Sequence, residues 1–309
     1  MNSSPKRFAP STDASSSWLE QRQKDWSRQA IDPKAGRRAL EGWFGQARHK
    51  QYPLWRYAPG ALDNWLVLGG RGSGKTRLGA EWVNALARGL PPFSEEGHSY
   101  GRFALVGETF ADVREVMIEG PSGILAASRR GRPRYEATRR RLVWDSGAVA
   151  TAFSSEDPDS LRGPQFEAAW CDELAKWKNA EATFDMLQFG LRLGPRPRQI
   201  VTTTPRPVPL VKRLMADPAF FLTRMRTDEN AGNLAAGFVA TVRARYAGTR
   251  LGRQELDGEL VEDRADALWS RAALEAAQDG HGALRRIVVA VDPPASSRRT
   301  SDACGLVVA

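Results

Sequence analysis

Short apolar runs alternate with stretches of helical periodicity along the middle of the chain. A run without polar interruption predicts a strand that is buried on both faces, as in parallel sheets covered by helices. Such runs are Trp65–Leu68 and Phe103–Val106. Phe166–Cys171 is similar apart from Glu167, and Arg198–Pro205 is a further β-branched run that ends in hydroxyls. Between the first two runs, one helix face recurs at Leu78, Trp82, Val83 and Leu86. This alternation predicts an α/β fold with a mainly parallel sheet.

The pattern changes elsewhere in the chain. Arg141–Trp144 and Ala148–Phe153 flank an Asp-Ser-Gly turn, which predicts a β-hairpin. From about Thr223 to Gly282 the sequence is charged and mostly of helical pattern. Arg286–Asp292 then predicts an apolar strand that delivers a carboxylate, and Ser301–Ala309 begins another strand after a polar turn.

The composition adds a basic balance. The 309 residues include 45 Lys+Arg and 36 Asp+Glu, a formal net charge of +9, which favours an anionic partner, with nucleic acid first. Part of the excess is local and consists of Arg129, Arg130, Arg132, Arg134, Arg139, Arg140 and Arg141. We expect a solvated, mobile loop face there, and a contact with a DNA backbone or a neighbouring subunit is the alternative.

Cysteine and histidine are scarce. The two cysteines, Cys171 and Cys304, and the three histidines exclude a disulfide framework and a His/Cys metal site. Both cysteines lie in apolar runs, so we interpret them as reduced core residues of a cytosolic protein. No apolar run approaches the length of a membrane span, and no signal peptide is visible.

The stretch Gly69–Thr76 fits the phosphate-binding pattern G-x-x-x-x-G-K-[ST]. Its members, all expected to bind ATP, are Gly69, Gly70, Arg71, Gly72, Ser73, Gly74, Lys75 and Thr76. Glycine lets the backbone curl so that N–H groups face phosphate oxygens, and the following helix N-terminus adds positive potential. We expect Lys75 to reach the β- and γ-phosphates and the Thr76 hydroxyl to hold Mg²⁺.

A second acidic signal follows about a hundred residues later. The strand at Phe166–Cys171 ends in Asp172 and Glu173, the Walker B arrangement, and we expect this strand end to lie beside the phosphate loop. Asp172 would hold Mg²⁺, and Glu173 would orient and deprotonate the attacking water. Thr202–Thr204 form a polar strand end that would sense hydrolysis, unless they only precede a proline turn. Gln46 and Gln51 are both candidates for the adenine contact.

Taken together, these pieces resemble the large subunit of tailed-phage terminases, the ATP-driven DNA-packaging motor and nuclease, over roughly Trp43–Ala309. The resemblance is carried by Gly69–Thr76, Asp159–Phe166, Asp172-Glu173, Thr202–Pro205, Arg250–Glu259 and Asp292. The run Arg253–Glu259 also resembles terminase-like proteins of gene transfer agents and prophages of alphaproteobacteria. The resemblance implies a P-loop ATPase followed by a ribonuclease-H-like nuclease.

The resemblance also implies roles for single residues. Arg71 would stabilise γ-phosphate charge or trigger hydrolysis, and Arg162 would be an arginine finger that enters a neighbour's site. The alternative for Arg162 is a turn residue that caps the following strand. Thr202–Thr204 would couple hydrolysis to movement. Asp292 and Asp302 match the first metal-binding acids of the nuclease, which holds Mg²⁺ or Mn²⁺.

The further carboxylates that such a nuclease needs are absent up to Ala309, so we expect a C-terminally truncated chain whose parent protein is also an endonuclease. We divide the chain into an N-terminal extension that is partly disordered (1–42), a P-loop ATPase core (43–225), a helical linker subdomain (226–284) and the start of the nuclease domain (285–309).

The expected function is ATP hydrolysis coupled to translocation of double-stranded DNA into a prohead. The resemblance implies a portal and a terminase small subunit as partners, a homo-oligomeric ring on the portal, a monomer in solution, the cytoplasm of a bacterial host and no membrane. A P-loop helicase or remodeller and an inactive prophage remnant are the alternatives. Helicases usually carry a second motor fold where this chain has Asp292, and intact Lys75, Thr76, Asp172 and Glu173 argue against an inactive ATPase.

Overall fold

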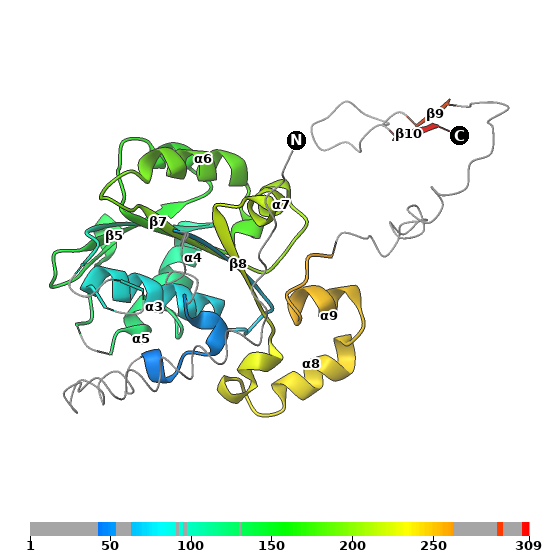
Figure 1. Ribbon diagram of the computed structural model, residues 1–309, viewed down its shortest axis with the longest axis horizontal. Coiled ribbons are helices and arrows are strands. Elements are labelled where there is room, and N and C mark those ends of the chain that lie inside the picture. The colour runs from blue at the N-terminus through cyan, green and yellow to red at the C-terminus, as the bar shows by residue number, and fades with distance from the viewer. Residues whose placement is uncertain are drawn as a thin grey trace, which may run out of the picture. The chain divides into compact units, whose positions relative to one another are not determined.

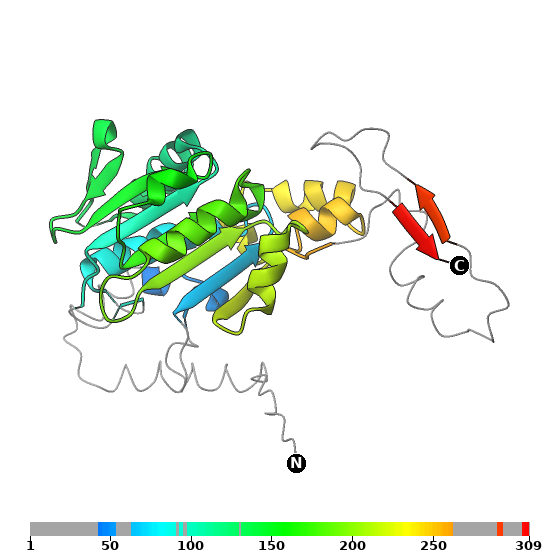
Figure 2. The ribbon, with the colours of Figure 1, turned by 90° about the horizontal axis from the view of Figure 1, so that it is seen from above.

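The computed structural model describes residues 43–53, 63–90, 93–94, 98–129, 131–261, 289–292 and 305–308. The chain divides into two compact units, Met1–Val261 and Glu262–Ala309. Figure 1 shows the first unit as a twisted sheet with helices on both faces, which Figure 2 shows from above. In the described residues no helix is long and apolar enough to cross a membrane.

The centre of the first unit is an 8-stranded sheet in the order β3-β4-β5-β2-β6-β7-β1-β8. Its strands are β1 (Asn64–Gly69), β2 (Arg102–Gly107), β3 (Arg134–Glu136), β4 (Arg141–Val143), β5 (Val149–Ser154), β6 (Ala168–Asp172), β7 (Arg198–Thr203) and β8 (Phe220–Met225). From β5 to β8 all neighbours are parallel, whereas β3, β4 and β5 pair antiparallel. The predicted α/β fold with a mainly parallel sheet and the predicted hairpin are therefore confirmed.

Helices cover both faces of this sheet. The α-helices are α3 (Lys75–Arg88), α4 (Phe110–Asp112), α5 (Ile124–Ala127), α6 (Ala180–Gly190), α7 (Pro209–Ala216), α8 (Phe238–Tyr246) and α9 (Arg250–Glu255). The short helices are η1 (Trp43–Gly45), η2 (His49–Gln51), the π-helix η4 (Val113–Ile118), η5 (Ala137–Arg139), η6 (Pro158–Leu161), η7 (Leu174–Lys176) and η8 (Asp228–Asn233). One hydrophobic cluster joins the sheet to α3, η4 and α5, and another joins the opposite face to α6 and α7.

Strand β1 shows why the apolar runs are continuous. Trp65 and Val67 belong to the cluster on the α3 side, while Leu66 and Leu68 belong to the cluster on the α6 side. Successive side chains of a strand point to opposite faces, so a strand covered on both faces needs apolar residues at every position. All of these residues are buried, and the run at 65–68 is confirmed as a buried strand.

Helix α3 packs on β6 at one unusually close point. A Cβ placed on Gly79 would lie 2.1 Å from Cε2 of the Trp170 indole. Glycine in a helix interior lowers helix stability by about 1 kcal/mol relative to alanine. The close approach of the indole explains why glycine nevertheless stands at this position. The helix that follows the glycine-rich loop is thereby fixed against the strand that ends in Asp172.

The strand end at Asp172 and Glu173 lies beside the phosphate loop, as expected, with Glu173 Oε1 3.6 Å from Lys75 Nζ, although β6 and β1 are not neighbours in the sheet. The end of β6 does not lie next to β1, because β7 pairs with both of them. The threonine run lies between them, with Leu68 paired to Thr203 and Asp172 paired to Thr202, while β8 pairs with the other side of β1, with Gly69 opposite Met225. Sequence periodicity identifies strands but contains no information on their order across a sheet.

Strand β8 was not predicted. The helical pattern was placed from about Thr223, but Thr223 lies inside β8, at the edge of the sheet. An edge strand has only one neighbour and is only partly covered, and the residues at the start of β8, Phe220–Leu222, are half-buried. Its contact with the core includes a hydrogen bond from Trp65 Nε1 to Thr223 Oγ1 of 2.8 Å. From η8 to α9 the segment is helical, as predicted.

In the described part of the arginine-rich segment, β3, η5 and β4 form a hairpin at the edge of the sheet rather than an irregular loop, and Arg132, Arg134, Arg139 and Arg140 are exposed, as expected for a solvated face. Glu136 of β3 lies 2.6 Å from Arg134 Nη1 and 2.6 Å from Arg141 Nε, and the Arg140 guanidinium lies 3.8 Å from the centre of the Phe110 ring. These contacts connect the hairpin to Glu136 within it and to Phe110 of α4. The contact with DNA or a neighbouring subunit stays a prediction.

The described part of the second unit is an antiparallel strand pair. Strand β9 (Val289–Asp292) pairs with β10 (Gly305–Val308), and Asp292 lies opposite Gly305. Both strands were predicted from their apolar pattern. Asp302 and the N-terminal extension 1–42 lie outside the described residues.

Candidate nucleotide-binding site

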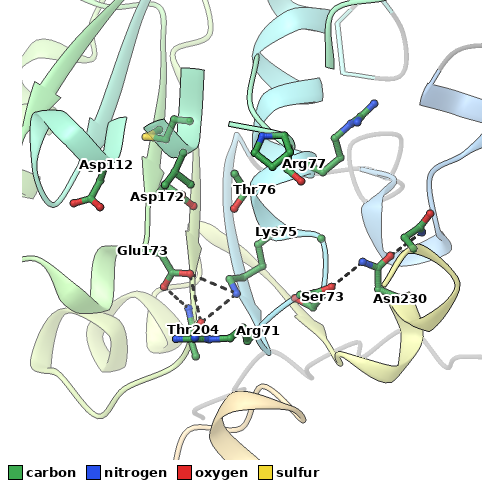
Figure 3. Close-up of a pocket in the computed structure, with 18 of the residues that line it drawn as sticks. Arg71, Ser73, Lys75, Thr76, Arg77, Asp112, Asp172, Glu173, Thr204 and Asn230 are labelled. Atoms are coloured by element: carbon green, nitrogen blue, oxygen red, sulfur yellow. Dashed lines mark hydrogen bonds and ion pairs between the residues drawn. The ribbon is translucent and has the colours of Figure 1, made fainter. Parts of the chain in front are cut away.

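The glycine-rich loop connects the end of β1 to the start of α3. β1 ends at Gly69 and α3 begins at Lys75. Gly72 and Gly74 have φ angles of 74° and 87°, a left-handed conformation that a residue with a Cβ rarely adopts. The loop borders a cavity of about 720 Å³, seen in Figure 3 with Lys75 and Thr76 on one side and Asp172 and Glu173 on the other. The predicted order of strand, loop and helix is confirmed.

Every backbone carbonyl from Gly69 to Gly74 accepts a hydrogen bond from a side chain. Lys75 Nζ donates to the carbonyls of Gly69 (2.9 Å) and Gly70 (3.1 Å). The others accept from Thr227 Oγ1 (to Arg71, 2.7 Å), Asn230 Nδ2 (to Gly72, 2.7 Å), Arg48 Nη2 (to Ser73) and Gln51 Nε2 (to Gly74, 3.3 Å). In a trans peptide the N–H group points away from the carbonyl of the same plane. Because the carbonyls are bound to side chains of the protein, the N–H groups of the loop are left to face an anion.

Asp172 is the last residue of β6 and is buried. Its Oδ1 accepts a hydrogen bond of 2.6 Å from Thr202 Oγ1, and the same Thr202 oxygen accepts one of 2.8 Å from Trp170 Nε1. Burial and the neighbouring Glu173 carboxylate raise the pKa of Asp172, whereas the Thr202 hydrogen bond and the Lys75 charge act in the opposite direction. The carboxylate is thus held in one orientation at the wall of the cavity.

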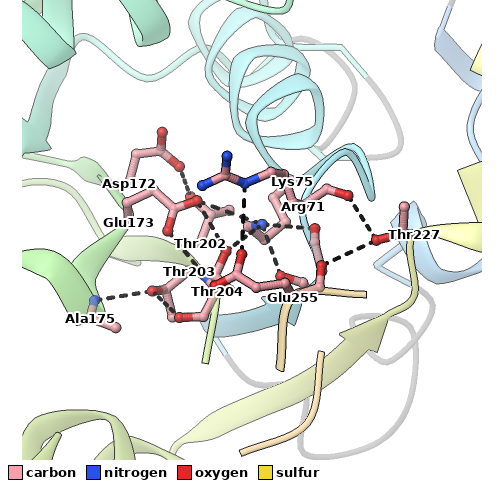
Figure 4. Close-up of polar contacts among 12 residues, drawn as sticks. Arg71, Lys75, Asp172, Glu173, Ala175, Thr202, Thr203, Thr204, Thr227 and Glu255 are labelled. Carbon is pink, nitrogen blue, oxygen red and sulfur yellow. Dashed lines mark hydrogen bonds and ion pairs between the residues drawn. The ribbon is translucent and has the colours of Figure 1, made fainter. Parts of the chain in front are cut away.

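Glu173 has an unusual backbone conformation. Its φ of 49° and ψ of 42° place it in the left-handed region, which is uncommon for a residue other than glycine and is concentrated at functional sites. Its Oε2 accepts a hydrogen bond of 3.1 Å from Thr204 N, and its Oε1 lies 3.6 Å from Lys75 Nζ. The left-handed turn therefore directs the carboxylate toward the lysine of the phosphate loop (Figure 4).

The threonine run connects these groups to one another. Thr203 Oγ1 accepts from Ala175 N (3.0 Å) and donates to the Thr204 carbonyl (3.1 Å), while Lys75 Nζ donates to Thr204 Oγ1 (3.2 Å). Together with the bonds to Asp172 and Glu173, these contacts make the end of β7 the common support of both acidic residues and of the lysine. The sequence predicted a polar strand end here but not its contacts.

The two arginines singled out from sequence lie in different surroundings. Arg71 borders the cavity, is 77% exposed, and has its Nε 3.7 Å from Glu255 Oε2. Arg162 is exposed, pairs with Asp159 at 2.6 Å, and is not among the residues that border this cavity. Within one chain, the structure therefore brings Arg71 but not Arg162 to the site.

Both candidates for the adenine contact border the cavity. The amide of Gln51 is engaged by the Arg48 backbone N–H (3.0 Å) as well as by the Gly74 carbonyl, and Gln46 accepts a hydrogen bond from Arg129. The structure gives Gln51 a role in supporting the loop, which sequence reasoning missed.

Three further residues that contact the loop were also missed. Thr227, Asn230 and Glu255 follow the last strand of the sheet and carry no recognisable nucleotide-binding pattern. The only signal was that Glu255 lies inside the stretch Arg250–Glu259 that carried part of the family resemblance. Their proximity to the loop depends on the pairing of β8 with β1.

The oxygen atoms at the cavity fit a magnesium ion that is bound together with a nucleotide. The Thr76 hydroxyl and the Asp172 carboxylate both border the cavity, and Mg²⁺ in such sites uses one or two protein oxygens plus phosphates. Across the described residues no group of three or more His, Cys, Asp or Glu side chains is placed to hold a metal. The donor set thus suits a nucleotide-linked ion and not a cage made of protein ligands alone.

Three features define a P-loop nucleoside-triphosphatase fold. They are a mainly parallel sheet, a glycine-rich loop held between the buried strand β1 and helix α3, and an acidic pair that faces the loop lysine. The family model described as "Terminase large subunit, T4likevirus-type, N-terminal" matches residues 66–276. This match spans more than half of the chain, and the chain belongs to that family. No curated protein sequence matches the chain.

Solved structures agree with this assignment at the level of fold. The large terminase of a thermophilic bacteriophage superposes with a TM-score of 0.56 and 16% identity, covering 69% of this chain and 53% of that one. The same terminase in complex with ADP gives a TM-score of 0.55 at 15% identity, covering 69% of this chain and 53% of that one. Its complex with ATP-gamma-S gives a TM-score of 0.54 at 15% identity, covering 69% of this chain and 52% of that one. This chain therefore spans about half the length of the solved terminase that it matches.

Proposed function

We propose that this chain is the ATP-hydrolysing part of a DNA-packaging motor, in which hydrolysis drives double-stranded DNA into a prohead. One observation carries the proposal: Glu173, in a left-handed backbone conformation, directs its carboxylate to the loop lysine Lys75 across the cavity. Family membership supports the packaging role, and the thermophilic phage terminase, solved with ADP and with ATP-gamma-S, supports the nucleotide.

The residues of the site divide the work of hydrolysis. The loop N–H groups and Lys75 would bind the phosphates of ATP, since both carry positive potential into the cavity. Glu173 would accept the proton of the attacking water, because it is the carboxylate that faces the loop lysine. The Thr204 backbone N–H, at 3.1 Å from Glu173 Oε2, would keep the other oxygen directed at that water.

Magnesium would be held by the Thr76 hydroxyl and the Asp172 carboxylate, which both border the cavity. When bound, such an ion neutralises charge on the β- and γ-phosphates. Thr202 orients the Asp172 carboxylate for this purpose with its 2.6 Å hydrogen bond.

We assign the coupling of hydrolysis to movement to Thr202–Thr204. Thr202 bonds Asp172, and Thr204 bonds both Glu173 and Lys75. A change in charge at the cavity would therefore be transmitted directly to the end of β7. The sheet and its helices would form the ATPase core (43–225), and η8, α8 and α9 would belong to the linker subdomain (226–284).

We propose that Arg71 stabilises the negative charge that develops on the γ-phosphate bound by its own chain. Arg162 would act as an arginine finger in the site of a neighbouring chain. Arg71 borders the cavity, whereas the Arg162 side chain is 69% exposed and pairs with another exposed side chain, Asp159. A ring on a portal, with a small subunit as a further partner and in the cytoplasm of a bacterial host, would bring Arg162 to such a site.

The Arg162→Ala variant should lose activity only where chains assemble. We expect the ATPase rate per chain of the unaltered protein to rise with protein concentration, and the variant to remain at the low rate of the dilute protein. Arg213→Ala, which removes another exposed arginine paired with acidic residues, is the matched control. An equal loss at every concentration would contradict the assignment in trans and indicate a structural role.

The overall function is tested by phosphate release from ATP by the 309-residue chain. Turnover should require Mg²⁺ and stop when a chelator is added. Thr76 and Asp172 supply only two oxygen ligands, so the protein alone would hold the ion too weakly to keep it from the chelator. A forked duplex added to the reaction should stay paired, whereas strand separation would favour the helicase alternative. Absence of Mg²⁺-dependent turnover would overturn the proposal and favour an inactive remnant.

Endonuclease activity needs a separate assay. We attribute this activity to the full-length parent protein. Its further carboxylates would hold Mg²⁺ or Mn²⁺ together with Asp292 and Asp302. A supercoiled plasmid incubated with this chain and either metal should therefore remain intact, and cleavage that Asp292→Asn abolishes would contradict this division.

A further inference from the structure

The turn after α9 lies directly against the outside of the phosphate loop. Gly258, at a φ of 67°, has no room for a side chain: a Cβ there would lie 3.0 Å from the Met225 carbonyl and 3.1 Å from Gly69 Cα. A Cβ on Gly70 would in turn lie 2.5 Å from the Leu256 carbonyl. The two backbones are thus in contact without intervening side chains, so a shift of the turn would displace the loop.

The main chain of Arg71 is held on both sides by this contact. Its N–H donates to the Glu255 carbonyl at 2.6 Å, and its carbonyl accepts from Thr227 Oγ1 at 2.7 Å. Thr227 N donates to the Leu256 carbonyl at 2.8 Å, which closes the network. The Arg71 backbone therefore has one position relative to Glu255.

The side chains of the two residues also meet. Glu255 Oε2 lies 3.7 Å from Arg71 Nε, and Glu255 Oε1 accepts a hydrogen bond of 3.0 Å from Gln254 Nε2. The carboxylate is 22% exposed and the arginine 77% exposed. Figure 4 shows Glu255 approaching the Nε side of the guanidinium, with the terminal nitrogens directed away from it, on the side of Asp172 and Glu173.

An ion pair with one largely exposed partner contributes little to folding stability. Its geometric effect is larger, because an arginine side chain otherwise samples many rotamers. Holding the guanidinium by Nε leaves both terminal N–H₂ groups for a phosphate. The site then contains two ion pairs of the same kind, each between a cation of the phosphate loop and a glutamate. Lys75 lies 3.6 Å from Glu173, and Arg71 lies 3.7 Å from Glu255.

We propose that Glu255 is a positioning residue for Arg71, which it holds by Nε so that the terminal guanidinium nitrogens face the γ-phosphate of bound ATP. This inference rests on the proposed ATPase function. It places control of the loop arginine in the segment after the sheet, since Glu255 is the last residue of α9. A displacement of α9 would move the Arg71 guanidinium and change the rate of hydrolysis.

The test compares Glu255→Ala, Glu255→Gln and Arg71→Ala in the 309-residue chain, with kcat and KM for ATP measured separately. A misplaced catalytic group costs up to about a hundred-fold in rate, and we expect Glu255→Ala to lower kcat about ten-fold with little change in KM. Glu255→Gln should recover part of the rate, because its amide oxygen keeps a partial negative charge beside Arg71 Nε, although the full charge of the ion pair is lost. The double variant Arg71→Ala/Glu255→Ala should be no slower than Arg71→Ala alone.

The control is Glu181→Ala, which breaks an exposed pair of 2.8 Å between Glu181 of α6 and Arg213 of α7, neither of which borders the cavity. If Arg71→Ala is slow but Glu255→Ala has the same kcat as the control, Glu255 does not position Arg71. That result would overturn the inference and leave the ATPase proposal standing. Additive losses in the double variant would also overturn it. An unaltered chain without ATPase activity would overturn the proposed function and this inference together.

Discussion

Lys75→Ala should abolish ATP hydrolysis, with a fall in turnover of about a thousand-fold or more. The lysine is buried, and its ammonium group donates to the carbonyls of Gly69 and Gly70 and to Thr204 Oγ1. Its removal takes from the cavity the buried cation that would balance phosphate charge. Nucleotide affinity should also fall, and both effects are measured by phosphate release and by equilibrium titration with a fluorescent ATP analogue.

The variant also leaves Glu173 without its cationic neighbour at 3.6 Å, so its thermal unfolding must be recorded beside its activity. Lys178→Ala is the matched control, because Lys178 is exposed and lies outside the cavity. A folded Lys75→Ala protein with the turnover of that control would remove the central claim of the proposed function.

Glu173→Gln should separate binding from chemistry. Glutamine has the size of glutamate, and its amide oxygen still accepts the hydrogen bond from Thr204 N that is 3.1 Å in the native site. It cannot take a proton from water, and loss of a general base costs about 10²- to 10⁴-fold. We expect ATP affinity to be kept or increased, since a negative charge near the phosphates disappears, while single-turnover hydrolysis almost stops.

Glu156→Gln, which alters an exposed carboxylate outside the cavity, controls for the change of charge. If Glu173→Gln lost nucleotide binding together with turnover while remaining folded, Glu173 would be a structural support of the loop and not the base. Because φ of Glu173 is 49°, Glu173→Gly would not be strained, and it provides a second variant that lacks the carboxylate if the glutamine protein folds poorly.

Several elements could be predicted because their pattern is local. The run at β1, the loop with Gly72 and Gly74 in the left-handed region and the amphipathic helix α3 each depend on neighbours in the sequence. The acidic pair after β6 was found in the same way. Cys171 was expected to be a buried core thiol, and it is buried, with a pKa raised by desolvation and by the neighbouring Asp172 charge.

Other features depend on contacts that no local pattern contains. The insertion of β7 between β1 and β6 gives the threonine run its contacts with Asp172, Glu173 and Lys75. The left-handed conformation of Glu173 also appears only in the fold, because glutamate has no preference for it. Sequence reasoning could name these residues but not their geometry.

The sequence by itself determined the kind of protein: a phosphate loop of Gly69–Thr76 and an acidic pair at Asp172 and Glu173, within a family match at residues 66–276. These signals are local because phosphate binding needs consecutive N–H groups on a glycine-rich turn. Only the tertiary structure decided what holds the loop in place. Arg48, Thr227, Asn230 and Glu255 reach it from distant parts of the chain, and the last three do so because β8 pairs with β1 and carries the following segment onto the loop's outer side.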